Sequence, residues 1–206
     1  MSLTDMPDTV TDTVTDTDTD ADTDAGTDAG TDTGTRSAAD PGGTLVVATL
    51  PTPMGPLSVA VDADGVVHRA LFGAVSVLAL PDAREVAPAE VPGPVADAMT
   101  RYLAGDLTAL DTVPVRQPGG PFRQAAWAAM RTIRPGETVT YTELAELSGR
   151  PTAVRAAGSA CAKNLVAPFV PCHRVVRSDG TLGGYAYGLD VKRALLEHER
   201  RHATAG

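Results

Sequence analysis

Apolar residues recur at two different spacings along the chain, and the change of spacing predicts two kinds of structure. Up to residue 120, short runs rich in Val and Leu are bounded by Pro, Gly and Asp, which is typical of strands. The Asp-Gly turn at 62–65 predicts a β-hairpin from the runs on either side of it. The expected elements are strands at 44–50, 56–61 and 66–72, a loop or edge strand at 83–93, and a helix at 94–104 ending at Gly105. Residues 106–120 are expected to link this β-rich part to the rest.

Beyond residue 120 the apolar positions follow helical spacing. The predicted helices cover residues 122–134, 140–149, 151–163 and 191–202. Thr140 and Glu143 have capping-box spacing, and Pro151 is expected in the first turn of the following helix, where its missing N–H is not needed. The helices on either side of Gly149 have the outline of a helix-turn-helix, although any pair of antiparallel helices shares that outline.

The helix expected at 151–163 is unusually rich in Ala, Gly and Ser, and Arg155 is the only charged residue between 152 and 161. Small side chains allow a helix backbone to approach a neighbour closely. That neighbour is either a buried helix of the same protein or a groove of DNA. In the second case Arg155 can enter the base stack and replace a base that has been flipped out.

The apolar run Val170–Val176 contains the side chain that is the candidate nucleophile. The run is of β type, so Cys172 is expected at a kinked position of a buried strand, next to Pro171. Adjacent residues of a regular strand point to opposite faces. His173 can therefore act on the thiol only if the backbone turns here or a water bridges the two. We expect no metal site, because the chain has only four His and two Cys and we identify neither a Cys-x-x-Cys nor a His-x-x-x-His pair. A core cysteine beside an unrelated histidine stays open.

A partner for His173 can come from the last predicted helix. Lys192, two leucines and Glu199 share one stripe of that helix, so Glu199 lies on the side that the leucines bury. A buried carboxylate requires a polar partner. Glu199 would then orient the His173 imidazole, which would take the proton of Cys172. Alternatively, Glu199 pairs with Lys192 or lies in solvent.

Composition changes the picture at the N-terminal end. Residues 1–43 contain eleven Asp, twelve Thr, one Arg and no aromatic residue, and we predict a disordered acidic tail. This tail contributes −10 to the net charge of −9, residues 44–121 contribute −4, and residues 122–206 contribute +5. The helical part is therefore modestly basic. Such a charge suits a DNA partner, although it is also ordinary for a solvated surface.

Cysteine usage and hydropathy predict the compartment. The chain has only two cysteines, Cys161 and Cys172, and its N-terminus lacks the apolar stretch of a secretory signal. No run approaches the roughly 18 apolar residues that cross a bilayer. We expect a cytoplasmic protein that makes no use of a membrane.

A series of motifs runs without gaps from about Phe122 to Glu199. It comprises Phe122-Arg123-Gln124-Ala125-Ala126-Trp127, Pro135-Gly136-Glu137-Thr138-Val139-Thr140-Tyr141, Arg155-Ala156-Ala157-Gly158, Asn164, Pro171-Cys172-His173-Arg174-Val175-Val176, Gly180-Thr181-Leu182-Gly183-Gly184-Tyr185, and Lys192 with Leu195-Leu196. In this order the motifs resemble the O6-alkylguanine-DNA alkyltransferases, also called methylated-DNA-protein-cysteine methyltransferases.

The resemblance implies an α/β (α+β) fold. It places a small ribonuclease-H-like, β-rich domain at 44–116 and a mainly helical domain, with a winged helix-turn-helix-like DNA-binding motif, at 117–206. It also implies a monomer that repairs double-stranded DNA. The alkyl group of O6-alkylguanine, with O4-alkylthymine as a second candidate, would move to the cysteine after minor-groove contact and base flipping. Nothing hydrolyses the thioether product, so each molecule acts once and needs no cofactor.

Catalytic roles follow from the same resemblance. Cys172 would be the acceptor, His173 its base through a water, and Glu199 the group that polarises His173. Asn164 would brace the active-site turn by hydrogen bonds. Tyr141 would crowd the target phosphate and assist proton transfer to the guanine.

DNA and substrate contacts follow in the same way. Arg155 would replace the flipped base, with three small residues of its helix against the DNA, namely Ala156, Gly158 and Ser159. The carbonyls of Val175 and Cys172 would read the guanine. Two further residues would enclose it, namely Pro171 and Tyr185.

Some positions differ from the family pattern. Ala186 stands where some relatives carry a hydroxyl, and Tyr187 where relatives have Gly or Trp, so the range of alkyl sizes stays open. Residues 1–121 contain no Cys and only His68, and the N-terminal zinc site of some relatives is therefore not expected. Two other classes of protein remain as alternatives. One is a lesion sensor without chemistry, which Cys172 disfavours, and the other is a thiol hydrolase with a Cys-His-Glu triad.

Overall fold

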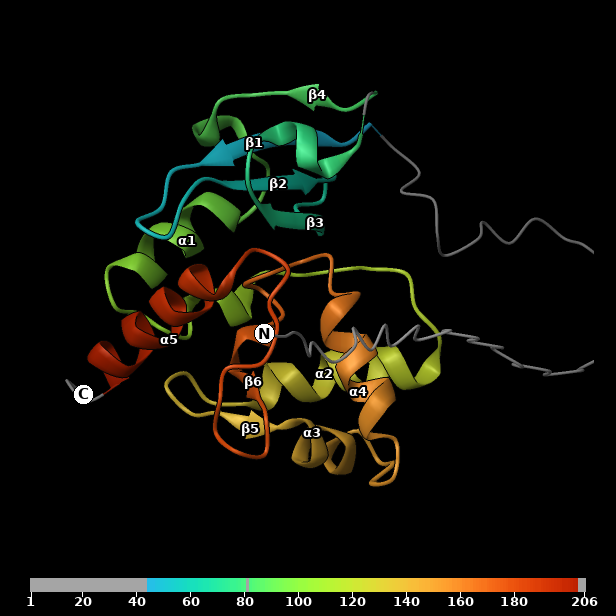
Figure 1. Cartoon of the computed structure of the whole chain (residues 1–206). Coiled ribbons are helices and arrows are strands. Elements are labelled where there is room, and N and C mark those ends of the chain that lie inside the picture. Colours follow the sequence, from blue (N-terminus) through green and yellow to red (C-terminus); the bar gives the residue numbers. More distant parts are fainter. Residues whose placement is uncertain (1–43, 81, 204–206) are drawn as a thin grey trace, which may run out of the picture. The chain divides into compact units, whose positions relative to one another are not determined.

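The computed structural model of the chain describes residues 44–80 and 82–203, which belong to a single unit (Figure 1). The predicted acidic tail at 1–43 lies outside the described residues. A small mixed sheet comes first and a mostly helical part follows, which confirms the predicted fold class. The ribonuclease-H-like sheet, the wing and the domain boundary at 116/117 stay predictions. In the part of the chain that the structure describes, no helix is long and apolar enough to cross a membrane.

The sheet has four strands in the order β3-β2-β1-β4, namely β1 (Val46–Leu50), β2 (Leu57–Val61), β3 (Val67–Phe72) and β4 (Arg84–Glu85). Strand β2 pairs antiparallel with β1 and β3, and the short edge strand β4 runs parallel to β1. The predicted hairpin is thus confirmed, and Gly65 in its turn has a φ of +79°, which favours glycine. Helix α1 (Val95–Leu103) packs on one face, and the 3₁₀ helix Val75–Leu78 covers the other.

The edge of β3 that faces away from β2 forms hydrogen bonds with two segments that are far apart in the sequence. The Val67 amide donates to the Pro114 carbonyl at 2.9 Å, and the Val67 carbonyl accepts from the Arg116 amide at 2.9 Å. Further along the strand, the Ala70 amide donates to the Leu165 carbonyl at 2.7 Å. The expected linker also contains a 3₁₀ helix at Ala109–Thr112. The linker is therefore packed against the sheet, and it approaches the segment that leads to the cysteine motif.

The helical part consists of α2 (Pro121–Thr132), α3 (Tyr141–Leu147), α4 (Val154–Ala162) and α5 (Leu189–Ala203), with a short parallel pair of strands, β5 (Val139–Thr140) and β6 (Val175–Val176). The capping box is confirmed, because Glu143 N donates to Thr140 Oγ1 at 3.2 Å and Thr140 N to Glu143 Oε2 at 2.6 Å. Helix α3 packs against α4, which gives the predicted helix-turn-helix outline.

Two local predictions were wrong. Pro151 does not open α4, because the Ala153 amide donates to the Arg150 carbonyl at 2.9 Å and closes a turn before the helix. The fixed φ of proline suits the second position of a turn as well as a first helical turn. Cys172 does not lie on a strand either. It starts a 3₁₀ turn, Cys172–Arg174, in which the Arg174 amide donates to the Pro171 carbonyl at 3.0 Å, and only the two residues after it pair with β5.

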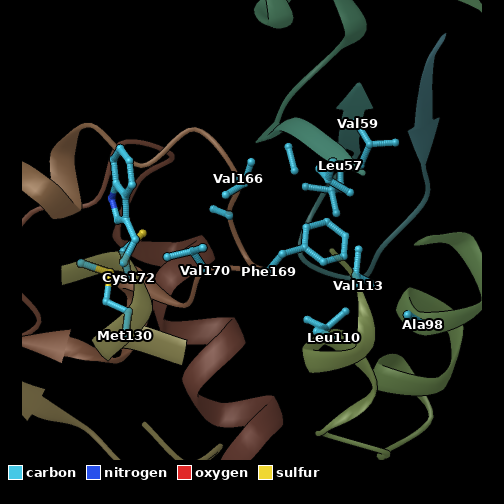
Figure 2. Close-up of a cluster of buried hydrophobic side chains, with 14 of the residues drawn as sticks. Leu57, Val59, Ala98, Leu110, Val113, Met130, Val166, Phe169, Val170 and Cys172 are labelled. Carbon is cyan, nitrogen blue, oxygen red and sulfur yellow. The ribbon is translucent and has the colours of Figure 1, made fainter. Parts of the chain in front are cut away.

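A continuous apolar cluster connects the cysteine turn to the sheet. Figure 2 shows Phe169 between the sheet residue Leu57 and the linker residues Leu110 and Val113, with Val170 leading on to Cys172. Phe169 is only 1% exposed, so the segment before the thiol is fixed by burial on the sheet side. The sheet therefore positions the turn that carries the cysteine.

We predict that Phe169→Ala lowers the free energy of unfolding by about 3–5 kcal/mol, because it removes a fully buried ring and leaves a cavity. Leu147→Ala, at a 55% exposed position of α3, is the control and should cost less than about 0.5 kcal/mol. Urea denaturation of both variants measures the difference. Equal losses would show that Phe169 does not link the sheet to the cysteine turn.

Candidate functional site

A pocket of about 260 Å³ opens onto the thiol of Cys172. Its lining comes from α3, α4, the cysteine turn and the loop before α5, and consists of Tyr141, Gly158, Cys161, Ala162, Asn164, Cys172, Gly184, Tyr185, Ala186 and Tyr187. Small-molecule pockets start at roughly 300 Å³, so this space suits only a compact ligand. Burial raises the pKa values of Tyr141 and Tyr185, and both phenols are therefore neutral proton donors at neutral pH. The pocket thus combines two thiols, those of Cys172 and Cys161, with aromatic walls.

Asn164 holds the cysteine turn through its side-chain amide. Its Nδ2 donates to the Val170 carbonyl at 2.7 Å and lies 3.2 Å from Cys172 Sγ. Burial raises the pKa of the Cys172 thiol, whereas the hydrogen bond from Asn164 acts in the opposite direction. Asn164 thus contacts both the turn and the sulfur, and its bracing role stays a prediction. The same contact also favours the thiolate.

His173 and Glu199 form a buried pair behind the turn. His173 Nε2 lies 2.8 Å from Glu199 Oε1, and both side chains are inaccessible to solvent. Burial lowers the pKa of His173 despite the nearby carboxylate, so the ring is neutral and donates Nε2–H to Glu199. Its Nδ1 then carries the lone pair. Nδ1 is buried and has no hydrogen-bond partner among the described residues, which leaves it available to accept a proton.

Glu199 accepts hydrogen bonds from four residues, which lie in three separate parts of the chain. Besides His173, they are the Tyr102 hydroxyl of α1 at 3.0 Å, the Gly136 amide at 3.1 Å, and the Arg174 guanidinium at 2.9 Å. Burial alone would raise the pKa of Glu199, but the contacts with His173 and Arg174 outweigh it and hold that pKa well below its usual value. Glu199 is therefore an ionised carboxylate, and its predicted pairing with His173 is observed. The alternatives of solvent or Lys192 as its partner are excluded.

Lys192 is a further buried charge near the thiol, in addition to Glu199 and Arg174. Its ammonium group donates to the carbonyls of Val175, at 2.7 Å, and Leu182, and lies 5.9 Å from the centre of the Tyr185 ring. Burial lowers the pKa of Lys192. Helix α5 is thereby connected to β6 and to the loop that carries the pocket tyrosines.

The outer face of α4 is exposed and does not pack against the rest of the described structure. Arg155, Ala156 and Ser159 are exposed, whereas the inner face is buried and the Ala160 carbonyl accepts from Trp127 Nε1 at 2.9 Å. An added Cβ at Gly158 would meet only a Tyr141 ring atom at 4.0 Å. Packing within the described structure therefore does not demand glycine at this position. The small-residue surface is free to approach another molecule.

The structure brings together only some of the predicted site residues. Cys172, Asn164, Tyr141, Gly158 and Tyr185 share the pocket. The remaining candidates lie outside its lining. His173 and Glu199 lie behind the turn, Pro171 and Val175 are buried beside it, and Arg155, Ala156 and Ser159 lie on the exposed face of α4. The roles assigned to these residues stay predictions.

The sequence analysis did not identify the side chains that donate hydrogen bonds to Glu199 and Asn164. Tyr102 lies in the helix predicted at 94–104, and because a buried tyrosine hydroxyl needs a polar partner, this signal could have revealed its contact with Glu199. Arg174 was noted only as part of a motif. Gln117 lies in the Pro-Gly linker, and no local pattern indicates that its side chain is buried and bonded to Asn164.

The expectation that the chain has no His-x-x-x-His pair was wrong, because residues 198–202 have a His-Glu-x-x-His spacing, which is typical of zinc-binding helices. In the structure these side chains have other partners. His198 Nε2 lies 2.8 Å from the Tyr102 carbonyl, and His202 Nδ1 lies 2.9 Å from the His198 carbonyl. Glu199 belongs to the pair described above. Within residues 44–80 and 82–203, no group of three or more His, Cys, Asp or Glu residues is arranged to hold a metal ion.

Comparison with known proteins assigns the chain to a family. A protein-family profile described as "6-O-methylguanine DNA methyltransferase, DNA binding domain" matches residues 121–201. The crystal structure of Mycobacterium tuberculosis OGT in complex with DNA matches with a TM-score of 0.66 and 35% identity, over 76% of this chain and 93% of that chain. The chain belongs to the 6-O-methylguanine DNA methyltransferase family. Membership of this methyltransferase family therefore rests on the whole described fold as well as on the helical part.

Matches to individual methyltransferase sequences are shorter. A methylated-DNA--protein-cysteine methyltransferase from Shigella flexneri is 44% identical over 108 residues, which are 52% of this chain and 63% of the relative. The bifunctional transcriptional activator/DNA repair enzyme Ada of Escherichia coli K12 is 53% identical over 88 residues, 43% of this chain and 25% of Ada. The chain thus matches less than two thirds of the length of either relative.

We predict that Glu199→Gln lowers the free energy of unfolding by about 3–5 kcal/mol, because it leaves the buried guanidinium of Arg174 without its counter-charge. The depressed pKa of Glu199 adds stability that is fully present above the unfolded-state value, near 4.3, and is lost as the pH falls below it. The variant should lack this acid-dependent loss. Denaturation between pH 3 and pH 7 tests both effects, with exposed Glu197→Gln as the control, and equal acid sensitivity of the two variants would contradict them.

Proposed function

We propose that this protein repairs alkylated DNA by moving the alkyl group of O6-alkylguanine, and of O4-alkylthymine as a second substrate, to its own Cys172. The supporting observation is a thiol that opens into a compact aromatic pocket, next to a buried His-Glu pair and beside a helix-turn-helix. Transfer breaks the bond between O6 and the alkyl carbon and forms a thioether. The thioether is not released, so each molecule reacts once.

Proton movement follows from the charge states of the site. Neutral His173 accepts the Cys172 proton at Nδ1, through a water between the two groups, and Glu199 stabilises the resulting imidazolium. The thiolate attacks the alkyl carbon while the bonding electrons pass into the purine. Tyr141 is a neutral phenol in the pocket wall and supplies a proton to the departing guanine. Asn164 stabilises the sulfur during the attack.

The DNA partner is proposed from the exposed face of α4. Arg155 enters the minor groove and occupies the space of the flipped nucleotide, while Ala156, Gly158 and Ser159 allow the duplex to lie close to the helix. The flipped base enters the pocket beside Tyr185, enclosed by Pro171 and read by the carbonyls of Val175 and Cys172. The similar OGT structure from Mycobacterium tuberculosis is a complex with DNA, which supports this partner.

Domain organisation and location complete the proposal. The sheet part at 44–116 supports the site, and the helical part at 117–206 binds DNA and carries the thiol. The protein acts as a monomer in the cytoplasm, where a reducing environment keeps Cys172 free.

Incubation with a duplex containing O6-methylguanine should transfer one methyl group per protein, and peptide mapping should place it on Cys172 and not on Cys161. Cys172→Ala should accept none, because it removes the nucleophile. Intact-protein mass spectrometry and quantification of repaired guanine test this prediction. More than one repaired guanine per protein, or an unmodified Cys172 peptide, would contradict it.

Arg155→Ala should slow transfer from duplex DNA at least about tenfold, because keeping a base outside the stack costs a few kcal/mol. Reaction with the free modified base should be unaffected, since no base has to be flipped. Arg84→Ala, which removes the same charge from exposed β4, is the control. Single-turnover rates on both substrates test the role. Equal loss on duplex and free base would assign Arg155 to the pocket instead.

A further inference from the structure

A row of hydrogen bonds connects the linker to the reactive sulfur. The Gln117 side chain, 6% exposed, lies just before α2. Its Nε2 donates to Asn164 Oδ1 at 3.1 Å, and its Oε1 accepts from the Leu165 amide at 2.8 Å. Asn164 Nδ2 in turn lies 3.2 Å from Cys172 Sγ. Gln117 is therefore two hydrogen bonds away from the thiol.

This arrangement decides which end of the Asn164 amide faces the sulfur. An asparagine amide has nearly the same shape in both orientations, so its hydrogen-bond partners choose between them. Oδ1 of Asn164 accepts from Gln117 and from the Val166 amide, at 3.2 Å. Nδ2 consequently points to the Val170 carbonyl and to Sγ. Reversal would place oxygen against the carbonyl and the sulfur, and would leave the Gln117 donor unpaired.

The sheet explains why Gln117 reaches this position. Strand β3 holds Arg116 through Val67 and holds Leu165 through Ala70. Gln117 follows the first of these anchored residues, and Asn164 precedes the second. The two side chains meet because one strand edge fixes both segments of backbone.

We propose that Gln117 is a positioning residue, which acts together with the Val166 amide and the Val170 carbonyl to hold Asn164 so that an N–H, and not a carbonyl oxygen, faces Cys172 Sγ and stabilises the thiolate. This role rests on the proposed function for its biological meaning. An N–H directed at sulfur favours the charged form of a thiol, whereas an oxygen opposes it. Strand β3 thus fixes the position of Gln117, and Gln117 in turn affects the ionisation of the thiol through Asn164, without contact with the substrate.

Gln117→Glu is the sharpest test, because the carboxylate keeps the shape and still accepts from Leu165 but has no N–H for Asn164. The alkylation rate of Cys172 by iodoacetamide, followed by peptide mass spectrometry across pH, should show a midpoint about one pH unit higher. At pH 7 the rate should fall about tenfold, and at high pH it should converge with the wild-type plateau. Gln117→Leu, which adds no charge, should shift the midpoint in the same direction.

Gln124→Glu is the matched control, since Gln124 Nε2 donates to the Gln117 carbonyl at 2.8 Å and does not touch Asn164. Its midpoint should stay at the wild-type value. The proposal is overturned if both Gln117 variants keep the wild-type midpoint, or if they only melt earlier and reach a lower plateau. Iodoacetamide needs no DNA. Failure of the wild-type protein to take a methyl group from DNA would therefore reject the proposed function while the midpoints still test Gln117.

Discussion

The site depends on one buried carboxylate. Glu199 is withdrawn from water, and the loss of hydration is offset only because donors surround both of its oxygens. These donors come from the helix on the sheet, the loop after α2 and the cysteine turn itself. Loss of any one donor would leave the buried charges less well compensated. The carboxylate therefore ties the sheet part, the helical part and the nucleophile into one arrangement.

Charge distribution around Glu199 also sets the chemistry that the turn can perform. Arg174 balances the carboxylate, so burial leaves His173 neutral and able to accept a proton. The thiol receives opposite influences, since burial disfavours its ionisation and the Asn164 amide favours it. The thiol is therefore held in its protonated form, and a neutral imidazole lies behind the same turn.

The sheet has an indirect part in this chemistry. It supplies no residue to the lining of the pocket, yet the edge of β3 fixes the backbone on both sides of the Gln117–Asn164 contact, and Phe169 anchors the cysteine turn in the apolar cluster (Figure 2). Rigid support from outside the pocket is what holds a reactive group within the narrow tolerance that catalysis requires. The family resemblance in sequence is strong in the helical part, and the sheet supplies contacts that hold segments of this part in place.

The sequence alone determined the elements whose signals are local. The Asp-Gly hairpin, the Thr140–Glu143 capping box and the buried stripe that carries Glu199 all follow from spacings of a few residues, and each was confirmed. Tertiary structure decided the rest. The turn at Cys172 replaced an expected strand because Pro171 cannot donate to a ladder. Tyr102 meets Glu199 across 97 residues, and Gln117 meets Asn164 across 47. Contacts at such separations leave no periodic trace in the chain, because they exist only after the sheet and the helices have packed.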